Sequence, residues 1–175
     1  MSGPLGVIAA VFLIPLALII AYYDVCYRRI PNPFVLATLI VGVGVNAGFG
    51  GVNGALASIG GCALAFALMF ALHIFGAMGA GDVKLFAAIG AVMGAQLVLP
   101  TFLMVALTGG VLGVISMLRA GELKPTMMRV FQILLGLLPG NKVPRFPVPA
   151  DRRHTIPYGV AITLGSLISV VIFRA

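Results

Sequence analysis

Two aspartates stand apart from the other acidic residues of this chain. Asp24 directly follows one long apolar run and Asp82 directly precedes another. Ionisable groups at the border of such runs are candidates for function, because charge near a membrane interior is costly. Two facing carboxylates cannot both ionise comfortably, so they share a proton. The ionised one can then activate water while the protonated one polarises a carbonyl, which would hydrolyse a peptide bond without a metal.

The residues around the two aspartates are suited to a site. Gly79 and Gly81 flank Ala80 just before Asp82, so the backbone there can bend sharply and approach a substrate strand closely. Residues 28–33, with the sequence Arg-Arg-Ile-Pro-Asn-Pro, form a basic turn soon after Asp24. Each proline disfavours helix in the residue before it, so this turn should end the first helical segment.

The composition indicates which elements position these residues. The chain has 175 residues, of which 61% are hydrophobic and 9% charged. Soluble domains carry roughly 25% charged residues, so the bilayer is the expected solvent and an all-α membrane protein is the expected fold. The net charge of +7 does not indicate a nucleic-acid partner, because the basic residues lie between apolar runs, where topology signals sit.

Hydropathy predicts six transmembrane helices in one domain covering 1–175. Each apolar run has about the 17–25 residues needed to cross the hydrocarbon core. Pro100 is expected at the start of the fifth helix, a position that suits its fixed φ and missing N–H. The six expected spans are 4–22, 34–50, 52–75, 83–99, 101–118 and 156–173.

The basic residues predict the orientation of these spans. With six spans, ten of the eleven Lys and Arg residues fall on one side of the membrane and only Arg174 on the other. The positive-inside rule makes the first side cytoplasmic, so both chain ends face outward. The ten residues are Arg28, Arg29, Lys84, Arg119, Lys124, Arg129, Lys142, Arg145, Arg152 and Arg153.

This topology places Asp24 and Asp82 at the same cytoplasmic edge. Each also has a structural interpretation: Asp82 as a helix N-cap, and Asp24 as the partner of Arg28 one turn later. Their shared location favours one common site over two separate structural roles. The remaining acids, Glu122 and Asp151, lie in the basic loop, where solvated charge is expected.

One long cytoplasmic connection, 119–155, joins the fifth and sixth spans. Within it, 126–138 is apolar but too short to span, so it could form an interfacial helix or a re-entrant piece. The proline-rich stretch 139–149 reads as an extended linker. The loop is expected to lie along the membrane surface, with a role in gating or substrate docking as the alternative.

Other chemistries find little support in the sequence. Cys26 and Cys62 form no CxxC pair, and neither has a nearby histidine to activate it, so both are interpreted as structural. His73 and His154 are the only histidines; His73 is interpreted as a packing or interfacial residue, and no metal site is predicted. No Gly-x-Ser-x-Gly elbow or phosphate-binding loop is present, so no cofactor is predicted.

Three blocks in order resemble the type IV prepilin peptidases, a family of GxGD membrane aspartyl proteases. They are Asp24 with 28–32, the Gly-Ala-Gly-Asp-Val-Lys block 79–84, and the Ile-Pro-Tyr-Gly-Val-Ala-Ile block 156–162. The resemblance implies that Asp24 and Asp82 are catalytic. The supporting or substrate-binding residues that it implies are Gly79, Gly81, Lys84, Pro31 and Asn32. Lys84 could orient Asp82, or it could simply extend its amine to the interface.

The resemblance also implies a substrate and a location. It implies cleavage of the short basic leader of prepilins or pseudopilins, at the cytoplasmic face of a bacterial inner membrane, with lipid and prepilin as partners. The chain lacks the extended region with paired CxxC motifs that longer members of the family have. The resemblance therefore implies neither a zinc site nor methylation of the new amino terminus. The short form resembles the CpaA/TadV type that serves Flp pili.

Two other functions use the same residues differently. A small ion- or proton-coupled transporter could use Asp24 and Asp82 as ligands, although polar residues near the midplane would then be expected. A non-enzymatic scaffold of a pilus machine would tolerate alanine at both aspartates. Loss of leader cleavage on replacing either aspartate separates the peptidase from both.

Overall fold

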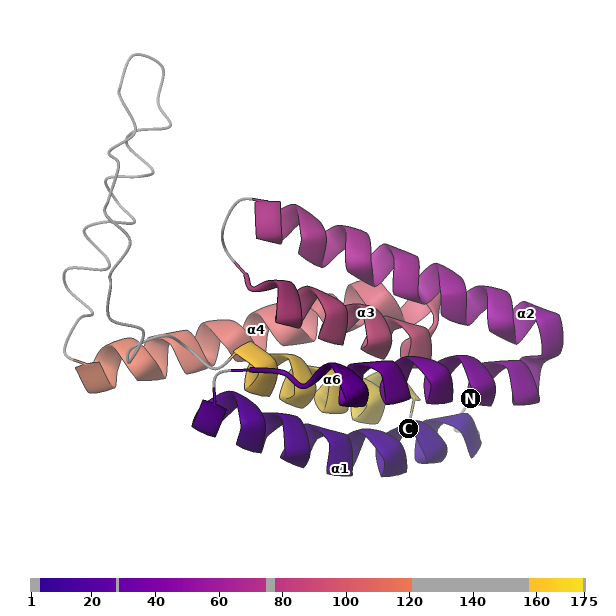
Figure 1. Ribbon diagram of the computed structural model, residues 1–175, viewed down its shortest axis with the longest axis horizontal. Helices are drawn as coiled ribbons and strands as arrows, with labels where there is room; N and C mark the ends of the chain where they lie inside the picture. The colour runs from indigo at the N-terminus through magenta and orange to yellow at the C-terminus, as the bar shows by residue number, and fades with distance from the viewer. Residues whose placement is uncertain (1–3, 28, 75–77, 121–157, 175) are drawn as a thin grey trace, which may run out of the picture. The chain divides into compact units, whose positions relative to one another are not determined.

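The computed structural model describes residues 4–27, 29–74, 78–120 and 158–174, and these are helical apart from short turns (Figure 1). No strand occurs among them. The all-α prediction is therefore confirmed for this part of the chain. The helices are α1 (Pro4–Tyr27), α2 (Asn32–Ile74), α3 (Ala80–Met93), α4 (Ala95–Ala120) and α6 (Tyr158–Arg174).

Helix α2 is a helical hairpin. Gly51 has φ 58° and ψ −140°, a conformation open to glycine but strained for other residues, and it interrupts the helix. Figure 1 shows the second arm of α2 turning back at this point and diverging from the first arm. The break falls between the expected segments 34–50 and 52–75, so the two arms correspond to those apolar runs.

Two helices are long and apolar enough to cross a membrane: Asn32–Ile74, with 43 residues, and Ala95–Arg119, with 25. Val11–Tyr27 and Tyr158–Phe173 are apolar but shorter. These lengths suit a membrane protein. The count of six spans and the outward orientation of both chain ends stay predictions.

The predicted helix start at Pro100 is wrong. Helix α3 ends at Met93, and Gly94 adopts φ 76° while its N–H donates to the carbonyl of Gly90 at 2.9 Å. Helix α4 begins at Ala95 and continues through Pro100. A proline inside a helix loses one hydrogen bond, which membrane helices tolerate when neighbouring groups compensate. A left-handed glycine therefore makes the break.

The chain divides into two compact units, Met1–Gly109 with Pro157–Ala175, and Gly110–Ile156. The site lies in the first unit. Of the second unit, the structure describes only the end of α4, from Gly110 to Ala120. The predicted interfacial segment 126–138 and the proline-rich stretch 139–149 lie outside the described residues.

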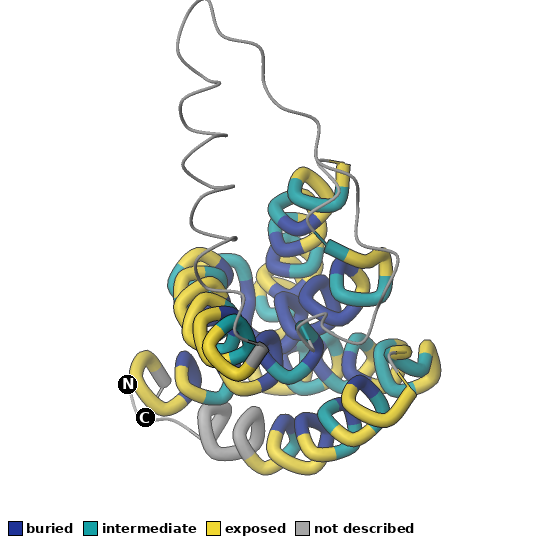
Figure 2. Tube along the Cα trace, turned by 90° about the vertical axis from the view of Figure 1, so that its left-hand side faces the viewer, coloured by how far each residue is buried: buried dark blue, intermediate teal, exposed yellow. Residues whose placement is uncertain are grey.

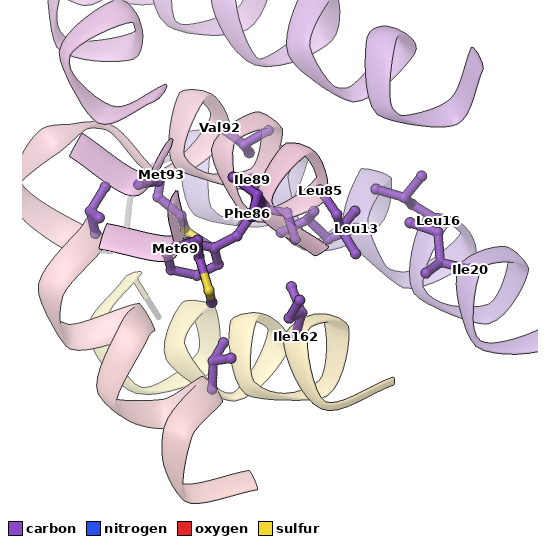
Figure 3. Close-up of a cluster of buried hydrophobic side chains, with 14 of the residues drawn as sticks. Leu13, Leu16, Ile20, Met69, Leu85, Phe86, Ile89, Val92, Met93 and Ile162 are labelled. Carbon is purple, nitrogen blue, oxygen red and sulfur yellow. The ribbon is translucent and has the colours of Figure 1, made fainter. Parts of the chain in front are cut away.

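Helix α3 forms the core of the first unit. All its residues from Leu85 to Met93 are buried, which Figure 2 shows as a dark-blue helix surrounded by others. Many large apolar side chains of the surrounding helices are exposed, such as Leu103 at 60% and Val171 at 65%. An apolar outer surface fits contact with lipid. The core side chains labelled in Figure 3 are Leu13, Leu16, Ile20, Met69, Leu85, Phe86, Ile89, Val92, Met93 and Ile162.

Glycines allow α2 and α3 to pack closely. A methyl group added at Gly42 would lie 2.8 Å from the backbone nitrogen of Val92, and one added at Gly90 would lie 2.5 Å from the Cβ of Ala65. A methyl group at Gly61 would overlap the carbonyl oxygen of Gly90. Small residues at such contacts are typical of membrane helices, which associate through close backbone packing.

Buried polar side chains of α2 hold the end of α3. Asn46 donates to the carbonyls of Ala91 at 2.9 Å and Val92 at 3.2 Å, and Ser58 donates to that of Ala91 at 2.6 Å. The last carbonyls of a helix have no partner within it, so these bonds satisfy them. One donor comes from each arm of the hairpin. Both arms therefore fix the helix whose other end carries Asp82.

Candidate active site

Asp24 is held by the first turn of α6. It lies in the last turn of α1, is 8% exposed, and its Oδ2 accepts the N–H of Gly159 at 2.8 Å. The first N–H groups of a helix lack partners within it and carry partial positive charge, so they suit a carboxylate. A Cβ on Gly159 would lie 2.9 Å from Oδ2, so only glycine allows this approach without a shift. The Arg28 partner considered for Asp24 lies outside the described residues.

The first turn of α3 places Asp82. Gly79 is the N-cap of this helix, and its N–H donates to Oδ2 of Asp82 at 3.2 Å. Asp82 is thus the third residue of the helix, and not its N-cap as the alternative structural interpretation had it. It still satisfies an N–H at the helix start, as a capping residue does. Its structural role and a chemical role use the same carboxylate.

The surroundings of Asp82 favour its protonated form. Asp82 is half-buried at the start of α3, just before the apolar run. Burial raises the pKa of its carboxyl to about 6; the Gly79 N–H opposes this rise and the nearby charge of Asp24 adds to it. Asp82 is therefore about half protonated near pH 6, where an ordinary aspartate is almost fully ionised.

The turn before α2 packs against the Gly-Ala-Gly-Asp block. A methyl group added at Gly81 would lie 3.8 Å from the Cβ of Ile30. Pro31 is half-buried and directly precedes α2. Its carbonyl accepts the N–H of Phe34, in the first turn of that helix, at 3.2 Å. Two segments about 50 residues apart in sequence thus meet beside Asp82.

The remaining predicted site residues differ in their exposure. Asn32, the first residue of α2, is exposed, as is Lys84. Gly79 lies against Asp82, because a methyl group added at Gly79 would be 3.2 Å from Oδ2 of Asp82. Asn32 and Lys84 are therefore accessible at this end of the helices, whereas the glycines shape the backbone.

Two contacts near the aspartates were not predicted. Gly159 lies within the third block, 156–162, but its contact with Asp24 could only be guessed from that block. His73, expected to be a packing or interfacial histidine, hydrogen-bonds through Nδ1 to the carbonyl of Met78 at 2.7 Å. Its sequence signal was its position nine residues before Asp82.

The donor groups do not assemble into a metal centre within the described part of the chain. No cluster of three or more His, Cys, Asp or Glu side chains occurs there. Cys26 is exposed and Cys62 half-buried, and both are free thiols. The chemistry available at this site is that of two carboxylates with backbone N–H donors.

The fold and the site define a helical protein with apolar, membrane-length segments and two carboxylates at helix ends. The model of the type IV leader peptidase family matches residues 11–114, a stretch that contains both aspartates. The chain belongs to this family, and the predicted resemblance is confirmed.

A curated relative is the prepilin leader peptidase/N-methyltransferase of Bacillus subtilis (strain 168). It is 31% identical over 116 residues, which cover 62% of this chain and 44% of the relative. The chain therefore spans less than half the length of this relative over the matched region. No solved structure matches the chain.

Proposed function

We propose that this protein is a membrane aspartyl endopeptidase that removes the short basic leader of type IV prepilins or pseudopilins. The observation that carries the proposal is that two carboxylates at helix ends are each held by a glycine N–H, Asp24 by Gly159 at 2.8 Å and Asp82 by Gly79 at 3.2 Å. Burial, with a smaller contribution from the charge of Asp24, raises the pKa of Asp82 to about 6. Pairs of titratable groups with different environments are typical of acid–base catalysis. Family membership supplies the substrate class.

The two carboxylates take complementary roles in the proposed reaction. Asp24 is the ionised base, since the Gly159 N–H at 2.8 Å stabilises negative charge on its Oδ2. It accepts a proton from water as the water oxygen attacks the scissile carbonyl. Asp82 donates its proton to the carbonyl oxygen, which gives a neutral diol.

Collapse of the diol completes the cycle. Asp24 passes its proton to the leaving nitrogen as the C–N bond breaks, and a hydroxyl proton of the diol returns to Asp82. Both carboxylates regain their starting states, so no metal or covalent intermediate is needed.

We propose that the reaction takes place at the cytoplasmic edge of the inner membrane. The asymmetry of ten basic residues against one supports this side under the six-span topology. The site lies where helices begin and end, with exposed Lys84 and Asn32 nearby. A leader on the aqueous side can reach such a position while the apolar part of its chain stays in the lipid.

We propose a peptidase without methyltransferase activity, acting on Flp-type pilins. The relative from Bacillus subtilis carries both activities in its name. The two cysteines in this sequence, Cys26 and Cys62, form no CxxC pair, whereas the longer members that the chain resembles have paired CxxC motifs. The transporter alternative is not favoured by the family membership.

The test is cleavage of a synthetic prepilin leader by the purified protein in lipid. Asp24→Asn and Asp82→Asn should each abolish cleavage, because asparagine matches the shape of aspartate but cannot exchange its proton. Arg119→Gln, at an exposed position of α4 that belongs to no predicted site, controls for a general change of charge and should keep its activity. Retained cleavage by either Asp→Asn variant in a folded state would refute the assignment.

A further inference from the structure

The peptide group between Met78 and Gly79 is hydrogen-bonded at both ends. Its carbonyl oxygen is 2.7 Å from Nδ1 of His73, and its N–H donates to Oδ2 of Asp82 at 3.2 Å. A carbonyl oxygen can only accept, so Nδ1 of His73 must carry the proton. The imidazole and the carboxylate are therefore linked through one peptide unit.

A single peptide unit transmits both direction and polarity. Because the peptide is planar, a donor that fixes its carbonyl also fixes where its N–H points. A hydrogen bond to the carbonyl also polarises the group, so the N–H becomes a stronger donor. Both effects strengthen the bond from Gly79 to Asp82.

We propose that His73 is a positioning residue for Asp82 and acts through the Met78–Gly79 peptide. His73 lies in the last turn of α2, and its ring contacts that of Phe70 at a centroid distance of 6.1 Å. The hairpin thus supplies a donor to the segment that leads into α3. The proposal rests on the proposed function for its effect on cleavage, but not for its effect on Asp82.

The alternative is that His73 only closes the connection between α2 and α3. A purely structural anchor would leave the titration of Asp82 unchanged in a folded variant. The Gly79 N–H lowers the pKa of Asp82 against the effect of burial. A weaker N–H donor would therefore let this pKa rise, and the direction of the change separates the two roles.

Other ionisable groups near this end of the helices stay constant in the comparison. They are Asp24 on α1, Tyr158 at the start of α6, Lys84 on α3 and Arg29 before α2. Variants at position 73 leave each of them in place. A shift common to both variants below would reflect the lost imidazole itself, and a shift in only one would reflect the lost donor.

The experiment compares His73→Asn with His73→Leu by NMR titration of aspartates labelled with ¹³C at Cγ. The chain has three aspartates, so the signal of Asp82 is assigned by its loss in Asp82→Asn. Asparagine places an amide N–H where His73 has Nδ1–H, whereas leucine has no donor. Cooperative strengthening of roughly 10–30% on a bond to a carboxylate corresponds to roughly 0.1–0.7 pH units.

We expect the midpoint for Asp82 to rise by that amount in His73→Leu and to stay near the wild-type value in His73→Asn. The alkaline limb of kcat/KM for leader cleavage should move by the same amount. An unchanged midpoint in His73→Leu, or equal shifts in both variants, would overturn the proposal. The titration needs no substrate, so it stands even where the wild-type protein cleaves no leader.

A measurement on the wild-type protein covers the case in which His73→Leu does not fold. Nitrogen-15 NMR of the imidazole distinguishes the two neutral tautomers. The proposal requires the proton on Nδ1, and a neutral His73 with its proton on Nε2 would refute it.

Discussion

Replacing Gly159 with alanine tests how closely α6 holds the carboxylate of Asp24. The new methyl carbon would lie 2.9 Å from Oδ2, 3.1 Å from Cγ and 3.3 Å from Cβ of Asp24. Ordinary contacts begin at 3.4 Å, so Oδ2 must retreat by about 0.5 Å. The hydrogen bond of 2.8 Å from Gly159 would then lengthen beyond the normal range.

The expected loss of activity follows from this displacement. A misplacement of about 1 Å can cost roughly 100-fold in rate, so a shift of half that size predicts roughly a tenfold loss in kcat/KM. Overpacking costs about 1–3 kcal/mol, and the better helix propensity of alanine offsets about 1 kcal/mol. The free energy of unfolding should therefore change by about 0–2 kcal/mol, a smaller effect than the one on catalysis.

The assay compares leader cleavage and thermal stability of Gly159→Ala with those of Gly48→Ala. A methyl group on Gly48, in the first arm of α2, meets nothing within 4 Å. Gly48→Ala has the same gain in propensity and should keep its activity. If Gly159→Ala cleaves at the wild-type rate, the contact with α6 does not position Asp24 for catalysis.

Two further predictions follow from Asp82 and from the α2–α3 contact. Because the proposed mechanism needs a protonated Asp82, kcat/KM should fall as pH rises through its pKa of about 6, by about tenfold per pH unit above it; a rate independent of pH between 5 and 8 would contradict this. Asn46→Leu should lower the free energy of unfolding by about 1–3 kcal/mol in detergent, since it removes the donor to buried carbonyls of α3. The exposed Asn53, replaced by leucine, is the matched control, and an equal effect of both changes would contradict a specific role for Asn46.

Local patterns were sufficient where the chain signals its own conformation. The predicted boundary between the runs 34–50 and 52–75 coincides with the break at Gly51. Each run is about as long as one membrane crossing, so the chain must turn between them. The apolar run 4–22 gave the position of α1 but not its end. Helix α1 continues to Tyr27, so Asp24 lies inside its last turn and does not follow it.

The break between α3 and α4 depends on tertiary structure. Pro100 is the stronger local signal, whereas Gly94 is one of 23 glycines. The end of α3 is fixed by Asn46 and Ser58 from the hairpin, whose distance in sequence hides the contact. The bond from His73 to Met78 is also invisible to the sequence, since it requires α2 to end beside the start of α3.

The contact between Gly159 and Asp24 gives a physical reason why three separate blocks resemble one family. The block at 79–84 contains Asp82 and its donor Gly79, and the turn at 28–32 packs on it through Ile30. The block at 156–162 contains no acidic residue, so it cannot supply a catalytic carboxylate itself. In the structure it supplies the N–H that holds Asp24 and the missing side chain that lets α6 approach. Each carboxylate thus accepts a glycine N–H at a helix start, from its own helix for Asp82 and from another helix for Asp24. The position of the Asp24 carboxylate therefore depends on how α6 packs against α1. A change in this packing should reduce catalysis by displacing Asp24, while Asp82, held by Gly79 at the start of its own helix, stays in place.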